Sequence, residues 1–314
     1  MTTNAASTTT VSASTSAENA RRFTPAKVRE MLWGYAMIAP LLIGLIVFFY
    51  YALGTSFFIS LTKWDVLTQP IWVGLDNYTR LFNNNLFWKT LGNTTRFTLL
   101  SVPTGLIVSL LLAMALNTRI RFRNVYRLIL FLPVLTMPVA IAVVWKWIYN
   151  PEFGLLNQVL GMFGVAKLKW LSDVNLAMPA LVIMSVWMSA GYGMIIFLAG
   201  LQNIPREYYE AAEVDGANSW QKFWRITLPL LTPTIFFNLV TSLIGAFQVF
   251  DIVYTMTKGQ PLESTRTLVY TIWDDGFHYF RMGSATATAW VLFVIILLVT
   301  IVQFRVQKRW VHYE

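Results

Sequence analysis

Cysteine is absent from the sequence of 314 residues, and histidine occurs only at His278 and His312. Without cysteine the chain has no disulfides, no thiolate metal ligands and no cysteine nucleophile. Two histidines leave little from which to build an imidazole metal site or a catalytic triad. We therefore expect no metal site, no cofactor and no catalytic residue in this chain.

Charged residues are also scarce, at 12% of the sequence, whereas 56% of the residues are hydrophobic. A soluble domain carries about a quarter of its residues as charged side chains. This chain therefore has too few polar residues to cover the surface of a large soluble protein. Its net charge of +9 does not indicate nucleic acid, because the basic residues border long apolar runs, where they act as orientation signals.

The sequence contains several long apolar runs without charged residues. A helix that crosses the hydrocarbon core needs about 20 residues, because lipid offers the backbone no hydrogen-bond partner outside the helix. The sequence therefore predicts an all-α polytopic membrane protein with six transmembrane helices. The six charge-free runs of at least 18 residues are 31–62, 97–118, 128–145, 174–205, 226–250 and 282–304.

Six crossings place both termini on one side of the membrane. The loop after the second predicted span is strongly basic from Arg119 to Arg127, and short basic loops stay in the cytoplasm. Both termini are therefore expected to be cytoplasmic. Residues 1–25 are expected to form a disordered cytoplasmic tail, since they begin with a run rich in Thr, Ser and Ala. Residues 26–314 then form the six-helix membrane domain.

The segment 203–229, between the fourth and fifth predicted spans, is the long cytoplasmic loop. Pro205 suits a first helical position, and Glu207 places negative charge near the positive end of a helix. Gly216 suits a helix end that requires positive φ. The pattern predicts a short helix over 205–215.

A second short helix is predicted directly afterwards. Asn218 followed three residues later by Gln221 resembles a capping box. This helix is expected to run to about Arg225, before Pro229 introduces the fifth span. The loop is therefore predicted to be two short helices that lie parallel to the membrane.

Such a helix pair exposes an amphipathic surface outside the bilayer. Small side chains at Ala211 and Ala212 allow another protein to approach the backbone, and Glu210 and Glu213 can accept hydrogen bonds from basic side chains of that partner. From the residues alone, a helix that lies in the lipid headgroups is an equal alternative.

A seven-position pattern in this loop is specific. Glu210-Ala211-Ala212 is followed after three residues by Gly216, and after nine more by Ile226-x-Leu228-Pro229. A chance match of all seven positions in a chain of this length is on the order of one in a million. The pattern resembles the EAA signature of the membrane subunits of binding-protein-dependent ABC importers.

The resemblance covers most of the chain from about residue 31. Val73-Gly74-Leu75-Asp76-Asn77-Tyr78, Phe153-Gly154-Leu155-Leu156-Asn157 and Trp170-Leu171-Ser172-Asp173 are similar to the carbohydrate-uptake branch, the permeases of the maltose, lactose and glycerol-phosphate type. One departure is Gly259-Gln260-Pro261, where relatives commonly read Gly-Gly-Pro. Residues 1–25 lie outside the resemblance.

The resemblance implies a type I ABC importer permease fold in a bacterial or archaeal cell membrane. It implies that this chain is the first permease of a pair and translocates a sugar delivered by an extracytoplasmic binding protein. The implied partners are a homologous second permease and two copies of a cytoplasmic ATPase. The residues implied in coupling to that ATPase are Glu210, Ala211, Ala212, Glu213, Asp215, Gly216, Ile226, Leu228 and Pro229.

ATP hydrolysis is not expected in this chain itself. The sequence contains no Gly-x-x-x-x-Gly-Lys-Ser/Thr loop to cradle phosphates. The resemblance therefore implies that the separate ATPase binds ATP, and that the loops at 63–96, 146–173 and 251–281 receive the binding protein.

The path of the sugar is predicted from polar and aromatic side chains at membrane depth, which face protein or a cavity. Each of them has a structural alternative, because Ser and Asn also tie helices together and interfacial Trp anchors a span. Asp251 is alternatively expected to pair with Lys258 or Arg266. The candidates are Trp187, Ser189, Tyr192, Asn238, Ser242, Gln248 and Asp251.

Two other functions compete with the importer. A stand-alone secondary transporter or channel would place ionisable residues at mid-membrane, but the six runs lack them. A membrane-embedded enzyme would cluster carboxylates or histidine near an interface, and Asp274, Asp275 and His278 form such a cluster. We interpret this cluster as a solvated outer loop. Pro103, Pro133 and Pro138 are expected to kink the second and third spans beside a pathway.

Overall fold

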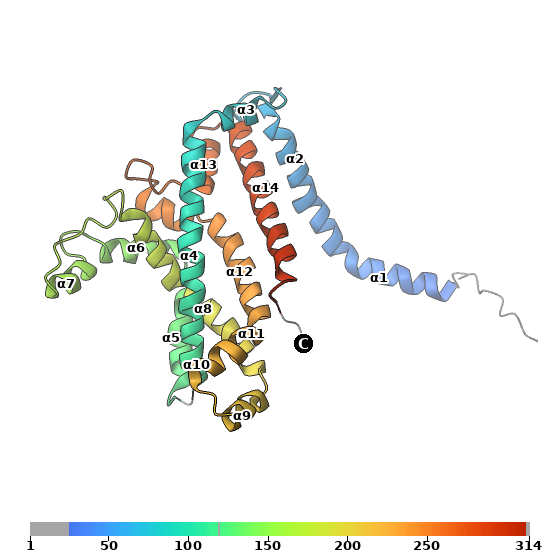
Figure 1. Ribbon diagram of the computed structural model, residues 1–314. Coiled ribbons are helices and arrows are strands. Elements are labelled where there is room, and N and C mark those ends of the chain that lie inside the picture. The colour runs from blue at the N-terminus through green and yellow to red at the C-terminus, as the bar shows by residue number, and fades with distance from the viewer. Residues whose placement is uncertain (1–24, 119, 312–314) are drawn as a thin grey trace, which may run out of the picture. The chain divides into compact units, whose positions relative to one another are not determined.

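The computed structural model describes residues 25–118 and 120–311, and these residues divide into two compact units at the boundary between Thr55 and Ser56. Of the predicted tail at 1–25, residues 1–24 lie outside the described part of the chain. Helices make up most of the described structure (Figure 1). The strands among the described residues form one short antiparallel pair, β1 (Thr62–Lys63) and β2 (Ile71–Trp72), in which Thr62 lies opposite Trp72.

The first unit is built from one long helix. It begins as α1 (Pro25–Gly44), passes through a π-helical turn at Leu45–Tyr50 and continues as α2 (Tyr51–Ser60). The stretch Val28–Ser60 is long and apolar enough to cross a membrane. Its large apolar side chains are exposed in the single chain, which suits a surface for lipid or for another membrane helix.

Three further helices are each long and apolar enough to cross a membrane: α4 (Asn85–Asn117), α8 (Ala177–Asn203) and α14 (Met282–Gln307). Two bent pairs complete a set of six, if each pair forms one span. They are α5 (Arg123–Leu135) with α6 (Pro138–Ile148), bent by 101°, and Ser219–Leu230 with α12 (Thr232–Phe247), bent by 64°.

The two bends interrupt the third and the fifth predicted spans. The third predicted span is broken because Thr136 and Met137 are extended, so that Pro138 starts a new helix. This confirms a kink near the predicted prolines, although it is far sharper than a proline kink within one helix. In the fifth span, α12 begins at Thr232, six residues later than the predicted start at 226.

The core of the second unit lies where α4 and α8 pack together (Figure 1). Met194 and Phe197 from α8 are fully buried against Ala113 and Leu116 of α4. Small residues allow this close approach. A Cβ built on Gly191 would lie 2.1 Å from the carbonyl oxygen of Leu130 on α5, so α5 and α8 are in backbone contact at this point.

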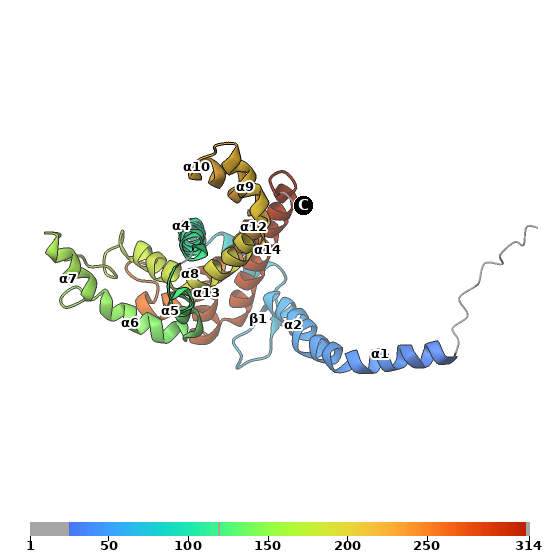
Figure 2. The same cartoon turned by 90° about the horizontal axis from the view of Figure 1, so that it is seen from below.

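The short elements lie mainly at the two ends of the second unit. Figure 1 shows α3 (Asp76–Phe82) at one end and α9 (Arg206–Val214) with α10 (Ser219–Lys222) at the other. Figure 2 shows α9 and α10 to one side of α4 and α12. The remaining elements are α7 (Leu155–Met162), α11 (Leu228–Leu230), α13 (Leu268–Trp273) and π-helical turns at Phe223–Thr227, Val253–Thr257 and Asp274–His278.

The Gly191 contact predicts a specific packing defect. Gly191→Ala is expected to lower stability by about 1–3 kcal/mol, because the new methyl group must push α5 away from α8. Gly92→Ala is the matched control, since Gly92 lies within α4 and a Cβ there meets nothing within 4 Å. The control is expected to be neutral or stabilising by up to about 1 kcal/mol. The unfolding midpoint of the full-length protein in detergent measures both, and equal midpoints would contradict the packing argument.

Candidate functional site

The loop between α8 and α12 folds as the predicted pair of short helices. The first, α9, spans Arg206–Val214, as expected for 205–215. Pro205 is the N-cap and not the first helical residue, because its ψ of 137° is extended. The second is α10, and the helix continues through the π-helical turn and α11 to Leu230.

A left-handed glycine ends α9, as the sequence predicts. Gly216 has φ of +75°, its N–H donates to the Glu213 carbonyl at 3.0 Å, and the N–H of Ala217 donates to the Ala212 carbonyl at 2.8 Å. These two bonds form a Schellman motif, which pairs the last carbonyls of a helix. Only glycine adopts this φ without steric cost, so the seven-position pattern requires glycine here for a local reason.

The predicted capping box starts α10. The side-chain oxygen of Asn218 accepts a hydrogen bond from the N–H of Gln221 at 2.9 Å. In return, the N–H of Asn218 donates to Oε1 of Gln221 at 2.8 Å. Both bonds satisfy amides that the first turn of a helix leaves unpaired, so the turn between the helices is defined on both sides.

Two side-chain contacts brace α9 against the helix that follows it. Lys222 Nζ lies 2.8 Å from Glu213 Oε1, and the hydroxyls of Tyr209 and Thr227 are 2.9 Å apart. Glu213 was expected to offer its charge to a partner protein, but in the single chain it pairs with Lys222. Glu210 remains exposed, and no ion pair is recorded for it among the described residues.

The face of the loop that is not braced is exposed and partly apolar. Val214 is 88% exposed and Trp220 is 70% exposed, and Tyr208 and Trp224 are also exposed. Within the predicted coupling set, Ile226, Leu228 and Pro229 are half-buried on the side that leads into α12. The loop therefore has one side that packs on its own chain and one side that is exposed.

A polar cavity of about 270 Å³ lies between α4, α8 and α12. It brings together four of the predicted path residues: Ser189 and Tyr192 from α8, and Asn238 and Ser242 from α12. Sequence reasoning missed other polar lining residues, because isolated serines and threonines in apolar runs carry no distinctive signal. These are Ser101, Ser109, Ser185 and Thr241.

Two buried polar atoms in the cavity wall have no hydrogen-bond partner among the described residues. They are Nδ2 of Asn238, a residue only 1% exposed, and Oγ of Ser101. A buried polar group without a partner costs about 1–3 kcal/mol. Neither atom is accessible in this conformation, so the amide and the hydroxyl can bind hydroxyl groups of a guest molecule only after the cavity wall moves.

The other three predicted path residues do not line this cavity. The ring of Trp187 packs edge-on against Trp145, with centroids 5.5 Å apart. Gln248 ends α12 and is exposed. Asp251 is also exposed, and its expected pairing with Arg266 is wrong, because Arg266 pairs with Asp274.

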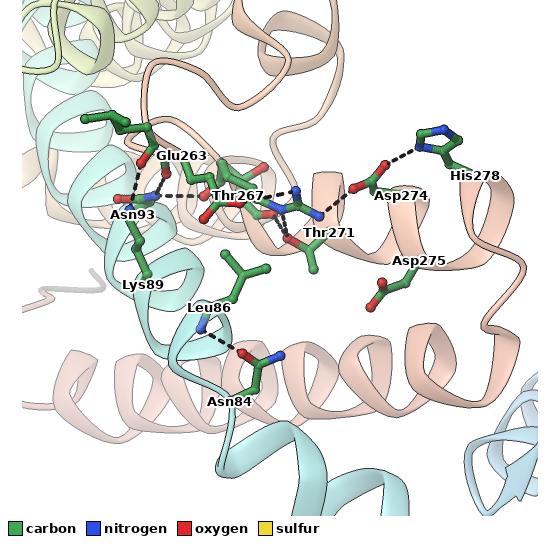
Figure 3. A network of polar contacts seen from close by, with 12 residues as sticks. Asn84, Leu86, Lys89, Asn93, Glu263, Thr267, Thr271, Asp274, Asp275 and His278 are labelled. Carbon is green, nitrogen blue, oxygen red and sulfur yellow. Dashed lines mark hydrogen bonds and ion pairs between the residues drawn. The ribbon is translucent and has the colours of Figure 1, made fainter.

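The acidic cluster is only partly solvated, contrary to the solvated loop we expected: the His278 side chain is 63% exposed, whereas those of Asp274 and Asp275 are 7% and 16% exposed. Arg266 Nη2 lies 2.5 Å from Asp274 Oδ2, and His278 Nδ1 lies 3.0 Å from Asp274 Oδ1. Figure 3 shows Asp274 pointing toward His278. The Asp274 side chain is only 7% exposed, because the segment is helical and packs against α14. The sequence did not indicate this burial, because the cation that makes it possible is not next to the carboxylates. Arg266 pairs with Asp274 from eight residues earlier in the chain.

The same network ties the loop at 251–281 to α4. The side-chain amide of Asn93 donates to the carbonyls of Glu263 and Arg266 at 2.7 and 3.0 Å, and Lys89 Nζ donates to the Leu262 carbonyl at 2.7 Å (Figure 3). A neighbouring cavity of about 490 Å³ includes Asp275 and Arg281, which are 3.0 Å apart. Burial raises the pKa of the Asp275 carboxyl, against the lowering effect of Arg281.

Comparison with known proteins agrees with these features. The profile of a family described as "Binding-protein-dependent transport system inner membrane component" matches residues 101–312. The probable ABC transporter permease protein YesP of Bacillus subtilis is 41% identical over 91% of this chain and 94% of its own length. The trehalose/maltose transport system permease protein MalF of Thermococcus litoralis is 36% identical over 90% of this chain and 96% of its own.

A solved structure shares the fold. It is a bacterial alginate ABC transporter in complex with an alginate pentasaccharide-bound periplasmic protein. Its matching chain superposes with a TM-score of 0.80 at 25% identity, over 92% of this chain and 98% of that one. The described architecture is therefore that of a type I ABC permease.

The buried network predicts that its arginine is important for stability. Arg266→Gln is expected to lower stability by about 3 kcal/mol, because it leaves the buried Asp274 carboxylate without its cationic partner. Arg80→Gln is the matched control, since Arg80 pairs with Asp76 on the surface, with side chains 72% and 43% exposed. Loss of that pair costs less than about 1 kcal/mol. The unfolding midpoints of both variants are measured in detergent. Equal decreases would show that the buried Arg266–Asp274 pair stabilises the protein no more than the surface pair does.

Proposed function

The chain belongs to the family of binding-protein-dependent transport system inner membrane components, and on this premise we propose that it forms half of the sugar path of an ATP-driven importer. As a member of this family it is a multi-pass membrane permease and not an enzyme. The relatives are named as a probable ABC transporter permease and as a transport system permease. They give no support to a stand-alone carrier or to a membrane-embedded enzyme.

The observation that carries the proposal is the helix pair α9–α10, exposed on one side and braced on the other. We infer that the exposed side, with Glu210, Ala211 and Val214, docks into a separate cytoplasmic ATPase that binds the ATP. The exposed apolar side chains favour a protein partner over water, and Ala211 allows close approach to the helix. Both termini are then cytoplasmic.

The braced side supplies the route by which a docked ATPase moves the spans. The contacts from Glu213 to Lys222 and from Tyr209 to Thr227 join α9 to the helix Ser219–Leu230. That helix leads directly into α12, which carries Asn238 and Ser242 into the polar cavity. Movement of α9 therefore reaches the cavity wall through packed, hydrogen-bonded elements.

The cargo proposed for this path is a sugar. Saccharides are bound by amides and hydroxyls that bond their hydroxyl groups, and by aromatic faces. The unpartnered amide of Asn238 and the exposed ring of Tyr192 provide both kinds of group in one cavity. The relatives named for trehalose and maltose, and the structure with alginate, handle saccharides.

The complete importer requires further subunits. We propose a homologous second permease that closes the path opposite α4, α8 and α12, two copies of the ATPase, and an extracytoplasmic binding protein. The binding protein is proposed to dock on the outer loops at 63–96, 146–173 and 251–281. The buried Arg266–Asp274 pair supports this docking surface, because it holds part of the third loop in one conformation.

Reconstitution with these subunits tests the assignment directly. Uptake of labelled mono- and oligosaccharides into vesicles is expected only when the ATPase, ATP and the binding protein are all present. Uptake by this chain alone, without the ATPase, would contradict the proposal.

Gly216→Val is expected to abolish most uptake while membrane insertion stays normal. A β-branched residue at φ of +75° costs about 1 kcal/mol or more, and this cost falls on the turn that orients α9. Gly216→Asn is the matched control, because Asn tolerates left-handed backbone far better. The amount of co-purifying ATPase and the uptake rate are measured for each variant. Normal uptake by Gly216→Val would show that the turn at Gly216 is not needed to orient α9.

Asn238→Leu is expected to reduce uptake efficiency by about fivefold, the effect of one lost hydrogen bond of about 1 kcal/mol. Thr241→Val lines the same cavity, but the Thr241 hydroxyl already bonds the Phe237 carbonyl at 2.9 Å. This control is expected to change uptake by less than about twofold. A reduction of the same size in both variants would show that the amide does not contact the sugar.

A further inference from the structure

An open depression of about 1040 Å³ lies at the end of the second unit that carries α9. Four segments meet there: the ends of α4 and α8 and the beginnings of α5 and α9. Figure 1 shows the ends of α4 and α5 near this end of the molecule. Neither the sugar path nor the exposed face of α9 includes this depression.

The lining of the depression is cationic. Arg121, Arg123 and Arg206 contribute guanidinium groups, and none of its lining residues is acidic. No ion pair is recorded for these three arginines among residues 25–118 and 120–311. Side-chain amides of Asn124 and Gln202 add further hydrogen-bond donors. The depression therefore attracts an anion that can accept several hydrogen bonds.

Two helix N-termini are the second observation that points to an anion. The thirteen-residue α5 begins at Arg123, and the nine-residue α9 begins at Arg206. At both helices the N-cap side chain forms no capping hydrogen bond. Helix N-termini carry partial positive charge and bind phosphate groups. Glu207, in the first turn of α9, does not line the depression.

The position of the depression indicates which anion it meets. Asn117 is the last residue of α4, and Gln202 is the last but one of α8, so two membrane-crossing helices end at its wall. The ends of such helices lie at the depth of the lipid headgroups. A phosphate at this depth belongs to a phospholipid.

Exposed apolar side chains next to the arginines favour the same ligand. Ile120 and Phe122 line the depression and are 41% and 64% exposed. Phe122 holds this position with φ of +61°, which is costly for a residue with a Cβ. A soluble anion offers nothing to these side chains, whereas a lipid presents acyl chains directly beside its phosphate.

We propose that this depression binds the headgroup phosphate of an anionic phospholipid of the cytoplasmic leaflet. The charge bias of cytoplasmic loops explains why arginines occur here. It does not explain why they converge with two helix N-termini in one depression. The proposal rests on the proposed function only for the assignment of this end to the cytoplasm.

The test uses the full-length protein with its partner subunits in nanodiscs that contain phosphatidylglycerol and phosphatidylcholine. Native mass spectrometry after detergent extraction measures how strongly phosphatidylglycerol is enriched among the retained lipids. Each basic residue near an anionic surface contributes about fivefold in binding, so R121Q/R123Q is expected to lower this enrichment about tenfold or more. Unfolding midpoints of the variants confirm that they remain folded.

R305Q/K308Q is the matched control, because it removes the same charge from the end of α14, outside the depression. It is expected to lower the enrichment by a smaller factor than R121Q/R123Q does, because these two side chains add only general attraction to the anionic surface and make no bond to a phosphate in the depression. Equal losses in the two double variants would overturn the proposal in favour of general charge attraction. Release of the retained lipid by inorganic phosphate would identify a soluble anion instead, and would also overturn it.

One further outcome concerns a protein ligand. If R121Q/R123Q reduces the ATPase that co-purifies in detergent and leaves lipid enrichment unchanged, the depression docks a protein and the proposal fails. Lipid enrichment is measured without uptake. A failure of this proposal is therefore distinguishable from a failure of the importer assignment, which uptake alone decides.

Discussion

Pairing of every backbone polar group inside the helices is the constraint on which this structure depends. Lipid provides no hydrogen-bond partner, so a crossing segment has to be helical wherever it meets hydrocarbon. The two bent pairs show how the chain departs from this rule. Thr136 Oγ1 donates to the Pro133 carbonyl at 2.6 Å, and Thr232 Oγ1 donates to the Pro229 carbonyl at 2.7 Å. At both breaks a threonine hydroxyl adds a hydrogen bond to a carbonyl that also accepts a backbone N–H.

The second of these breaks lies between the two functional parts of the molecule. Leu231, at the bend, is fully buried against the core of α4 and α8. On one side of it is the braced helix pair, and on the other is α12 with the polar cavity. Because packed interiors deform little, a buried bend transmits displacement better than an exposed hinge would. The geometry thus joins the exposed helix pair to the cavity between α4, α8 and α12 through packed elements.

Much of the fold and of the helix pair could be predicted because their causes are local. Apolar runs, the glycine at 216 and the capping pair Asn218 and Gln221 each act within a few residues of chain. The polar network of Arg266 and Asp274 could not be read in the same way. A carboxylate cluster has the same sequence whether water or a guanidinium group surrounds it, and only packing against α14 decides which. The cavity was predicted in part, since sequence places Asn238 at membrane depth but not the helices that face it.

The sequence by itself determined that the chain crosses a membrane, which segments are helical, and the signature of the loop that the ABC permeases share. These features follow from hydration and backbone geometry, which depend on neighbouring residues. The tertiary structure alone decided how sharply two spans bend, that Glu213 is held by Lys222, and that four of the seven expected path residues meet in one cavity. Such contacts join residues on different helices or across a turn, and their pairing depends on how the helices pack rather than on the residues themselves.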